Sequence, residues 1–547
     1  MSNLNWLTKI KKLFLFDSGR NSFFVAGILA LLGFALYSNT LNGGFCSDDY
    51  NIILNNTAIE DIKDIGFIWR SFNTRFLVGL SFALNYGLSG YKVFGYHLFN
   101  IFSHILASVC VYYFVRLTFQ TPVFKISSYT PKASLIAFFS SLIFLAHPLQ
   151  TQGVAYITQR AVSMGTIFYL TTLIFYIQSR LSGKITLRAA AFFTMLLGMM
   201  TKEFMITVPL MLAVYEFYFF EPGKSFEKFK RVAPFFAGIF CIFLIFFLDR
   251  RDSILHLRGQ IEGASFSRHY FLTEINVMRT YLRLLVLPIH QHHDYKYPVV
   301  ESFFEGPLLF SAALLAGLIF FAVKMFPKRR LLSFGIAWFF VSILVEVIHP
   351  CFVKKGLIYE HWLYLAMTGF SLFVSFALFS VLDKTAARRI LIGIIAVFCV
   401  MTYSRNKVWQ SEIALWEDNI QKSPQNATGY FALGAAYGRL NDFVNEMLLY
   451  EKTIGLDPNY YEAYNNLAVV YLKLGELEKV IEYCQKALYL KPDYPESLAT
   501  LGAVYFLKKE YGKASAYLQK AIDLYEQEGI FYKARHARNI LKRISRD

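Results

Sequence analysis

Two adjacent carboxylates stand where the chain leaves its first long apolar segment. Asp48 and Asp49 follow the apolar run at 22–40, within the sequence FCSDDY. Neighbouring carboxylates repel each other, so their pKa values should separate and one could serve as a general base near neutral pH. The alternative is an acidic helix N-cap at Ser47-Asp48-Asp49, favoured by free amide groups and the helix dipole. By itself, the dipeptide favours the cap.

Cationic side chains in this loop and in two others favour the functional interpretation. Arg75 lies in the same loop as the Asp pair, Arg160 follows the stretch 147–159, and Lys202-Glu203 occupies a very short turn between two apolar runs. Taken alone, the Lys-Glu pair is explained by an ion pair that closes a helical hairpin. The predicted sidedness places all these cations on the face that holds the Asp pair. Together they predict a site that positions an anionic phosphate beside a general base.

Histidines offer a second kind of chemistry. His97 and His104 are seven residues apart on one face of a predicted helix, whereas zinc ligands on a helix are usually four apart. We therefore expect interhelical hydrogen bonds from them and predict no metal site. Glu360-His361 is a further polar pair at the predicted outer boundary of a later apolar run, and the histidine-rich stretch 290–294 stays unassigned.

The amino-acid composition indicates that most of the chain lies in a membrane. Of its 547 residues, 55% are hydrophobic and 17% charged, and the mean hydropathy is +0.40. Soluble domains average about 45–50% apolar and about 25% charged residues. We predict eleven membrane spans from apolar runs that approach the roughly 20 residues a bilayer requires. They lie near 22–40, 96–115, 134–147, 163–180, 187–200, 203–219, 232–249, 306–324, 331–348, 362–382 and 390–403.

Basic residues predict the orientation of these spans. The net charge is +17, and most Lys and Arg residues flank apolar runs in every second loop. Cytoplasmic loops carry such an excess, so the charge reflects membrane orientation, and no nucleic-acid partner is expected. The N-terminus is then cytoplasmic and the C-terminus extracytoplasmic. This count treats 272–288, which contains Glu274, Arg279 and Arg283, as an interfacial or re-entrant helix.

A 34-residue repeat begins after residue 404. Small residues recur at Gly434, Ala468 and Gly502, in phase with Leu433, Leu467 and Leu501, with Tyr437, Tyr471 and Tyr505, and with Pro424, Pro458 and Pro492. This pattern is the tetratricopeptide (TPR) signature of stacked helix pairs. We predict a TPR solenoid over 405–547, capped by a helix near 529–545. Its concave surface suits an extended peptide or a partner helix; the alternative is a solubility or oligomer-packing module.

Several motifs resemble a known family when read in order. They are SDDYNIILNN, RFLVGLSFALNYGLSGYKVFGYHLFNIFSH, HPLQTQGVAYITQRA, TKEFMITVPL, LRLLVLPIHQHHDYKYP and YEHWLYL, followed by the TPRs. This order resembles the GT-C superfamily of polyprenyl-phosphate-dependent glycosyltransferases, and within it the transmembrane-and-TPR O-mannosyltransferase-like proteins and their bacterial relatives. The resemblance implies an all-α fold: a polytopic GT-C-like catalytic domain at 1–404, with a first outer loop at 41–95, and then the TPR solenoid.

The resemblance also implies site roles. Asp48 or Asp49 would deprotonate the acceptor hydroxyl, with Asp48 preferred, and the donor would be a sugar on a polyprenyl phosphate, transferred with inversion. By their position, and not by a family motif, Arg75, Arg160 and Lys202 are candidates to hold the donor phosphate, whereas His97, His104, Glu203, Glu360 and His361 would support them. Two positions depart from the family pattern: Phe76 follows Arg75 where relatives often have Pro, and His361 follows Glu360 where Arg is common.

The sequence thus predicts an inverting membrane glycosyltransferase. A mannose-like hexose would pass to a hydroxyl of a protein recruited by the TPRs on the extracytoplasmic face. The alternatives are a lipid or envelope-glycan acceptor, and a non-enzymatic TPR scaffold. We expect the bacterial inner membrane, with the endoplasmic reticulum as the alternative. The chain lacks a G-x-S-x-G elbow, a Walker loop, a dinucleotide fingerprint and a CxxC pair, which argues against soluble-enzyme chemistry.

Overall fold

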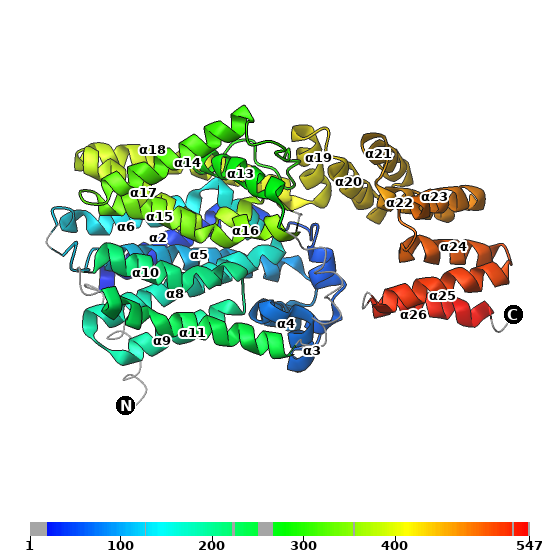
Figure 1. The fold of residues 1–547 in the computed structure, drawn as a ribbon, viewed down its shortest axis with the longest axis horizontal. Coiled ribbons are helices and arrows are strands. Elements are labelled where there is room, and N and C mark those ends of the chain that lie inside the picture. The colour runs from blue at the N-terminus through cyan, green and yellow to red at the C-terminus, as the bar shows by residue number, and fades with distance from the viewer. Residues whose placement is uncertain are drawn as a thin grey trace. The chain divides into compact units, whose positions relative to one another are not determined.

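The structure, a computed structural model, describes residues 19–125, 127–220, 225–249, 266–353, 356–527 and 530–544. Helices account for all regular secondary structure in these ranges, which contain no strand (Figure 1). The all-α prediction is therefore confirmed. The chain divides into two compact units, Met1–Ser411 and Glu412–Asp547.

The first unit is a bundle of long apolar helices joined by short 3-10 helices. Its α-helices are α2 Gly19–Tyr37, α3 Ile65–Phe72, α4 Phe76–Ser89, α5 Val93–Thr118, α6 Ala133–Ala146, α7 Thr151–Ala155, α8 Arg160–Ser182, α9 Ile185–Met199, α10 Val208–Phe219, α11 Ser225–Asp249, α13 Arg268–Val286, α14 Gly306–Met325, α15 Arg330–Ser342, α16 Leu344–Val353, α17 Ala366–Val381 and α18 Lys384–Asn406. The short helices that concern the site are η4 Asn73–Arg75, η7 Ile157–Gln159, η8 Glu203–Thr207, η9 Glu360–Leu363 and η10 Lys407–Gln410.

The centre of this bundle is α5. It packs against α2, α6 and α8, and α6 in turn packs against α17, which packs against α15. Close approach depends on small residues: a Cβ added at Gly369 of α17 would lie 2.6 Å from the buried Trp338 ring of α15. Interiors packed this tightly hold their helices in fixed register, so loops at the helix ends are held firmly.

Within the described residues, six helices are long and apolar enough to cross a membrane. They are Ser22–Thr40, Val93–Thr118, Ile157–Ser182, Gly306–Met325, Arg330–Val353 and Lys384–Gln410, and the bent pair Thr130–Ala146 plus Pro148–Ala155 would make a seventh. The predicted count of eleven is therefore not confirmed. Several predicted spans form helices shorter than the roughly 20 residues of a straight span, with 15 residues in α9, 12 in α10 and 16 in α17.

Sidedness is not determined by these helices. The basic N-terminal residues 1–18, where the predicted orientation begins, lie outside the described residues. The segment expected to be interfacial forms α13, a 19-residue helix that does not count among the candidate spans. Its charged residues Glu274, Arg279 and Arg283 account for this low apolarity.

The bend of 53° between α6 and the helical segment after it has a local cause. Pro148 disfavours the helical region for the preceding residue, and His147 is extended, with ψ 131°. The ring Nδ1 of His147 then accepts from the backbone N–H of Leu149 and so caps the next helix, which begins at Pro148. The bend redirects the chain toward Tyr156 and Thr158, which contact the Asp pair.

The second unit is a series of antiparallel helix pairs. Its helices are α19 Glu412–Lys422, α20 Ala427–Arg439, α21 Phe443–Leu456, α22 Tyr461–Leu474, α23 Leu477–Leu490, α24 Pro495–Leu507, α25 Tyr511–Gln527 and α26 Phe531–Ile544. The phased small residues lie where paired helices meet: a Cβ at Gly434 would lie 2.9 Å from the Tyr450 ring, and one at Gly502 would lie 2.6 Å from Leu518. The period seen in the sequence is thus a packing requirement.

Candidate functional site

Asp49 anchors the turn that carries the acidic pair. Its side chain is buried, with 1% exposed. Oδ2 accepts from the backbone N–H of Cys46 at 3.0 Å, and Oδ1 accepts from the backbone N–H of Thr158 at 2.9 Å. Ser47 has a φ of 52°, in the left-handed region, so the turn is sharp. Both carboxylate oxygens are therefore occupied in fixing this turn against the segment before α8.

Burial changes the acidity of this carboxyl. Desolvation raises the pKa of Asp49 from 3.8 to about 7. The backbone hydrogen bonds from Cys46 and Thr158 lower the pKa, and the charge of Asp48 raises it, but burial has the largest effect. The shift therefore comes mainly from burial and only to a small extent from the repulsion between neighbouring carboxylates on which the sequence-based expectation rested.

Asp48 is the exposed member of the pair. Its backbone N–H donates to the Tyr156 hydroxyl at 2.9 Å, and its carbonyl accepts from the N–H groups of Asn51 and Ile52. Its carboxylate has no hydrogen-bond partner within the part of the chain that the structure describes. The backbone is therefore held in place while the carboxylate faces solvent, an arrangement suited to accepting a proton from a bound hydroxyl.

Arg75 and Lys202 meet at a shared carboxylate. Nε and Nη2 of Arg75 each lie 2.9 Å from Oε1 of Glu203, and Nζ of Lys202 lies 3.5 Å from Oε2. Burial raises the pKa of Glu203, but the two cations lower it more, to about 2. The carboxylate stays ionised, and the group of three carries one net positive charge.

The backbone holds this group together. Arg75 ends η4 and Glu203 begins η8. The N–H of Leu77, in the first turn of α4, donates to the carbonyl of Met200 at 3.0 Å. Lys202 is 6% exposed, whereas Arg75 and Glu203 are about two-fifths exposed, so the group opens to one side.

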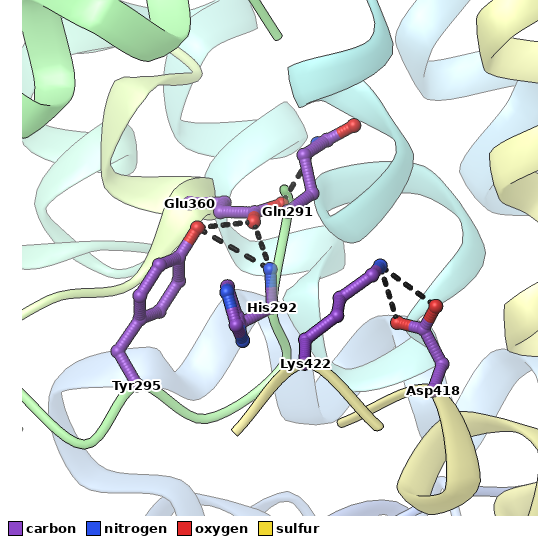
Figure 2. A network of polar contacts seen from close by, with 6 residues as sticks. All are labelled: Gln291, His292, Tyr295, Glu360, Asp418 and Lys422. Carbon is purple, nitrogen blue, oxygen red and sulfur yellow. Dashed lines mark hydrogen bonds and ion pairs between the residues drawn. The ribbon is translucent and has the colours of Figure 1, made fainter. Parts of the chain in front are cut away.

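Glu360 and His361 lie side by side in the sequence but have different contacts. Oε1 of Glu360 accepts from the backbone N–H of His292 and from the Tyr295 hydroxyl, and Oε2 accepts from Nε2 of Gln291 (Figure 2). Burial raises the pKa of Glu360. This carboxyl therefore fixes the histidine-rich stretch 290–294, for which the sequence alone predicted no role.

His361 faces the cations instead. Its backbone N–H and its ring Nδ1 both donate to Oε1 of Gln152, at 2.7 and 3.2 Å. Burial, and then the charges of Lys202 and Arg75, hold the pKa of His361 well below its usual range. The imidazole is thus neutral and lies within electrostatic reach of both cations.

Tyr359 connects the two halves of the site. Burial, and then the negative charges of Asp294 and Asp48, raise the pKa of its phenol. Its ring lies 5.5 Å from that of His361. Tyr359 and His361, at the start of η9, are thus close enough to feel the charge of Asp48 in the one case and of Lys202 and Arg75 in the other.

Arg160 lies inside the fold. It is fully buried, and its guanidinium donates to the side-chain oxygens of Asn85, Ser81 and Asn100 and to the backbone carbonyls of Ser81 and Tyr96. It also lies over the Phe82 ring, 4.3 Å from the centroid. Arg160 joins α8 to α4 and α5, and its donors are directed at protein acceptors.

Of the two α5 histidines, His104 makes the expected interhelical hydrogen bond, to α6, whereas His97 contacts the loop before the Asp pair. Nε2 of His97 donates to the carbonyl of Gly43 at 3.2 Å. His104 accepts from the Tyr364 hydroxyl at Nδ1, at 2.6 Å, and donates from Nε2 to the Leu145 carbonyl at 3.1 Å. His97 thereby fixes the loop that leads into the Asp pair.

Sequence reasoning missed four residues that shape the site. Tyr156 and Thr158 hold the Asp pair, Gln152 holds His361, and the Trp409 ring stacks on that of Tyr156, with centroids 5.4 Å apart. The first three lie in HPLQTQGVAYITQRA, so the motif carried a signal that the residue types did not. Trp409 gave no signal, because an aromatic residue beyond an apolar helix is common.

Known proteins similar to this chain match both of its units. Residues 461–494 and 495–528 each match a tetratricopeptide-repeat family model. Protein O-mannosyl-transferase TMTC4 of Mus musculus is 26% identical over 479 residues, covering 75% of this chain and 63% of the relative. Protein O-mannosyl-transferase F38B6.6 of Caenorhabditis elegans is 26% identical over 446 residues, covering 75% of this chain and 59% of the relative.

A third relative matches a shorter part of the chain. Protein O-mannosyl-transferase Tmtc2 of Drosophila melanogaster is 30% identical over 236 residues, covering 39% of this chain and 24% of the relative. The chain thus spans less than two thirds of the length of these curated relatives. The resemblance seen in the sequence motifs is confirmed: the chain is a homologue of the transmembrane-and-TPR protein O-mannosyl-transferases and carries the C-terminal TPR repeats.

Proposed function

We propose that this chain is an inverting membrane glycosyltransferase. It moves a mannose-like hexose from a polyprenyl-phosphate donor to a hydroxyl of a protein acceptor. The observation that carries the proposal is the exposed carboxylate of Asp48 on a turn that the buried Asp49 fixes. The names of the similar proteins, protein O-mannosyl-transferases, support the reaction class.

The proposed reaction is a single displacement. Asp48 accepts the proton of the acceptor hydroxyl, and the oxygen of that hydroxyl attacks the anomeric carbon of the sugar. The bond from that carbon to the phosphate oxygen breaks, and the polyprenyl phosphate leaves with the electron pair. Lys202 and Arg75 stabilise the leaving phosphate, and attack from the opposite face inverts the configuration.

The other predicted site residues act through position. Glu203 holds the two cations together, and Glu360 and His361 fix η9 and the stretch 290–294. We assign Arg160 and His104 to joining helices, because their side chains hydrogen-bond to other helices, and His97 to holding the loop at Gly43.

Localisation follows from the same proposal. The site and the TPR unit face the extracytoplasmic side, in the bacterial inner membrane or the endoplasmic reticulum. The TPR unit recruits the acceptor protein.

The predicted domain division at residue 404 falls within α18, whereas the compact units divide after Ser411.

Intact-mass spectrometry of extracytoplasmic proteins tests the proposal. A deletion strain would be complemented with the wild type, with Asp48→Asn or with Asp61→Asn. Asp61 is the matched control, an exposed carboxylate in the same loop that accepts from the nearby N–H of Lys63. We expect Asp48→Asn alone to lose a hexose-sized increment from one or more proteins.

Two other outcomes would overturn parts of the proposal. Unchanged protein masses, with a sugar lost from a lipid or envelope glycan, would replace the protein acceptor. Full complementation of every deletion phenotype by Asp48→Asn would establish a non-enzymatic scaffold.

A further inference from the structure

An apolar groove lies at one end of three helices of the first unit. It has a volume of about 350 Å³ and is lined by Phe217, Tyr218, Ile319, Ala322, Val323, Phe326, Ile336, Ala337 and Phe340. None of these side chains is charged. The lining comes from the C-terminal ends of α10 and α14, from the residue after α14 and from α15. Because α14 and the α15–α16 segment are candidate membrane spans, this groove belongs to the part of the fold that contacts lipid.

The lining helix α14 is peripheral. Only 22% of its most apolar window is buried, and Phe320 and Val323 are each more than two thirds exposed. A groove on a helix of this kind opens toward the acyl chains of a bilayer, where an apolar wall is the expected surface.

Four cations surround the turn at the end of this groove. Lys324 is the penultimate residue of α14, and Lys328, Arg329 and Arg330 follow within six residues. Lys324 and Lys328 are exposed. Arg330 is engaged: Nη1 donates to the Tyr218 carbonyl at 3.0 Å, and the guanidinium lies 5.0 Å from the centroid of the Phe326 ring. Both contacts join the basic turn directly to residues that line the groove.

We propose that this groove binds an anionic glycerophospholipid. One acyl chain fills the groove, and the phosphate of the headgroup contacts Lys324, Lys328 and Arg329. Basic residues beside a crevice between membrane helices recognise anionic headgroups in this way. An apolar helix packed in the groove would also cover its apolar lining, but it would supply no anion for the cations. The site is separate from the Asp48 site, so it stands or fails independently of glycosyl transfer.

Native mass spectrometry of the full-length, detergent-solubilised protein tests the headgroup. Phosphatidylglycerol and phosphatidylcholine would be titrated separately. The combined variant Lys324→Gln, Lys328→Gln, Arg329→Gln keeps Arg330, whose guanidinium holds Tyr218. We expect it to bind phosphatidylglycerol about a hundredfold more weakly, since each of the three cations near a headgroup contributes roughly fivefold. Phosphatidylcholine binding should not change.

A charge-matched control distinguishes a specific effect of these three cations from a general effect of lowering the net positive charge. Lys384→Gln, Arg388→Gln, Arg389→Gln removes three cations from the start of α18 and should leave phosphatidylglycerol binding within about twofold. Equal losses in the two triple variants would overturn the proposal. So would displacement of phosphatidylglycerol by 10-fold less polyprenyl phosphate, or by inorganic phosphate alone, since a glycerophospholipid site requires acyl chains in the groove.

A second pair of variants tests the groove itself. Ala337→Phe fills it from α15 without changing charge, whereas Ala312→Phe adds the same ring to an exposed position of α14. Only Ala337→Phe should weaken binding of phosphatidylglycerol, by about tenfold. Unchanged binding in a folded Ala337→Phe protein would place the lipid elsewhere. If Ala337→Phe does not fold, the charge variants still test the proposal.

Discussion

At the scale of single residues, two neighbouring carboxyl groups have different surroundings. Asp49 is buried, and its oxygens accept from two backbone N–H groups, whereas Asp48 is exposed. The helix cap that the sequence offered as an alternative is not formed: Asp49 precedes the short helix Tyr50–Leu54 but makes no side-chain cap hydrogen bond to it, and binds Cys46 and Thr158 instead. Asp49 performs the structural role, and Asp48 is available for the chemical one.

The raised pKa of Asp49 predicts how stability depends on pH. Its folded-state pKa of about 7 lies above its ordinary value of 3.8, so between these values the folded state binds more protons than the unfolded state. The contribution of this carboxyl to stability is therefore fully present below pH 3.8 and is lost as the pH rises to about 7. Thermal unfolding from pH 5 to 8 should show this decline.

Asp49→Asn removes that titration and one acceptor. We expect a flatter dependence of the melting temperature on pH, together with a loss of about 1–3 kcal/mol of stability, because an amide offers only one acceptor oxygen to two donors. An unchanged slope in this variant would contradict the assignment of the titration to Asp49.

At the scale of helices, Arg160 joins three elements. Its guanidinium binds acceptors of α4 and α5 from the start of α8. Removing it would leave these buried acceptors without a donor.

Arg160→Ala should therefore lose about 3 kcal/mol or more of stability, seen as a lower melting temperature and folded yield. Arg75→Ala is the matched control. Its side chain is 40% exposed and paired with Glu203, so we expect a loss of less than about 1 kcal/mol in stability but weaker binding of the donor. A wild-type melting temperature for Arg160→Ala would contradict its joining role.

The end of α18 and η10 pack beside the segment that leads into the Asp pair. Asn406 donates to the Leu36 carbonyl, and the N–H of Gly44 donates to the Gln410 carbonyl, both at 3.0 Å. Trp409 stacks on Tyr156, whose hydroxyl accepts from the N–H of Asp48. The position of Asp48 thus depends on a helix that is far away in sequence.

Tyr156→Phe tests this dependence. It removes the acceptor of the Asp48 N–H, and we expect kcat to fall about tenfold, with stability changed by about 1 kcal/mol and KM for the donor little altered. Tyr91→Phe removes a hydroxyl that donates to Glu60 and should retain wild-type kcat. Equal kcat values for the two variants would show that the hydroxyl of Tyr156 does not position the base.

At the scale of the whole molecule, the proposed function requires a defined orientation in the membrane. The proposal places the TPR unit and the start of α18 on opposite sides of the membrane. Tyr489 is 87% exposed in the TPR unit, and Arg388 is exposed near the start of α18.

Cysteine labelling resolves this arrangement. In a chain carrying Cys241→Ser, which removes an exposed thiol, Tyr489→Cys should react with a membrane-impermeant maleimide before permeabilisation and Arg388→Cys only afterwards. The reverse pattern would place the TPR unit in the cytoplasm and would contradict recruitment of an extracytoplasmic acceptor.

The sequence by itself determined the helical fold class and the TPR unit. Period and composition are local properties: the small residues Gly434 and Gly502 recur because one helix of each pair crosses its partner there. The motifs likewise identified the homologous family. The number of spans did not follow from apolar runs, because short helices such as α9 and α17 have the composition of a span without its length.

Only the tertiary structure decided what each polar side chain contacts. Arg75, Arg160 and Lys202 look alike as cations in loops, yet Arg160 is buried among acceptors whereas the other two share Glu203 at an opening. The Asp pair is held by Tyr156 and Thr158, more than a hundred residues later in the chain. Burial and hydrogen bonding are set by packing between distant segments, and no local pattern of residues encodes that packing.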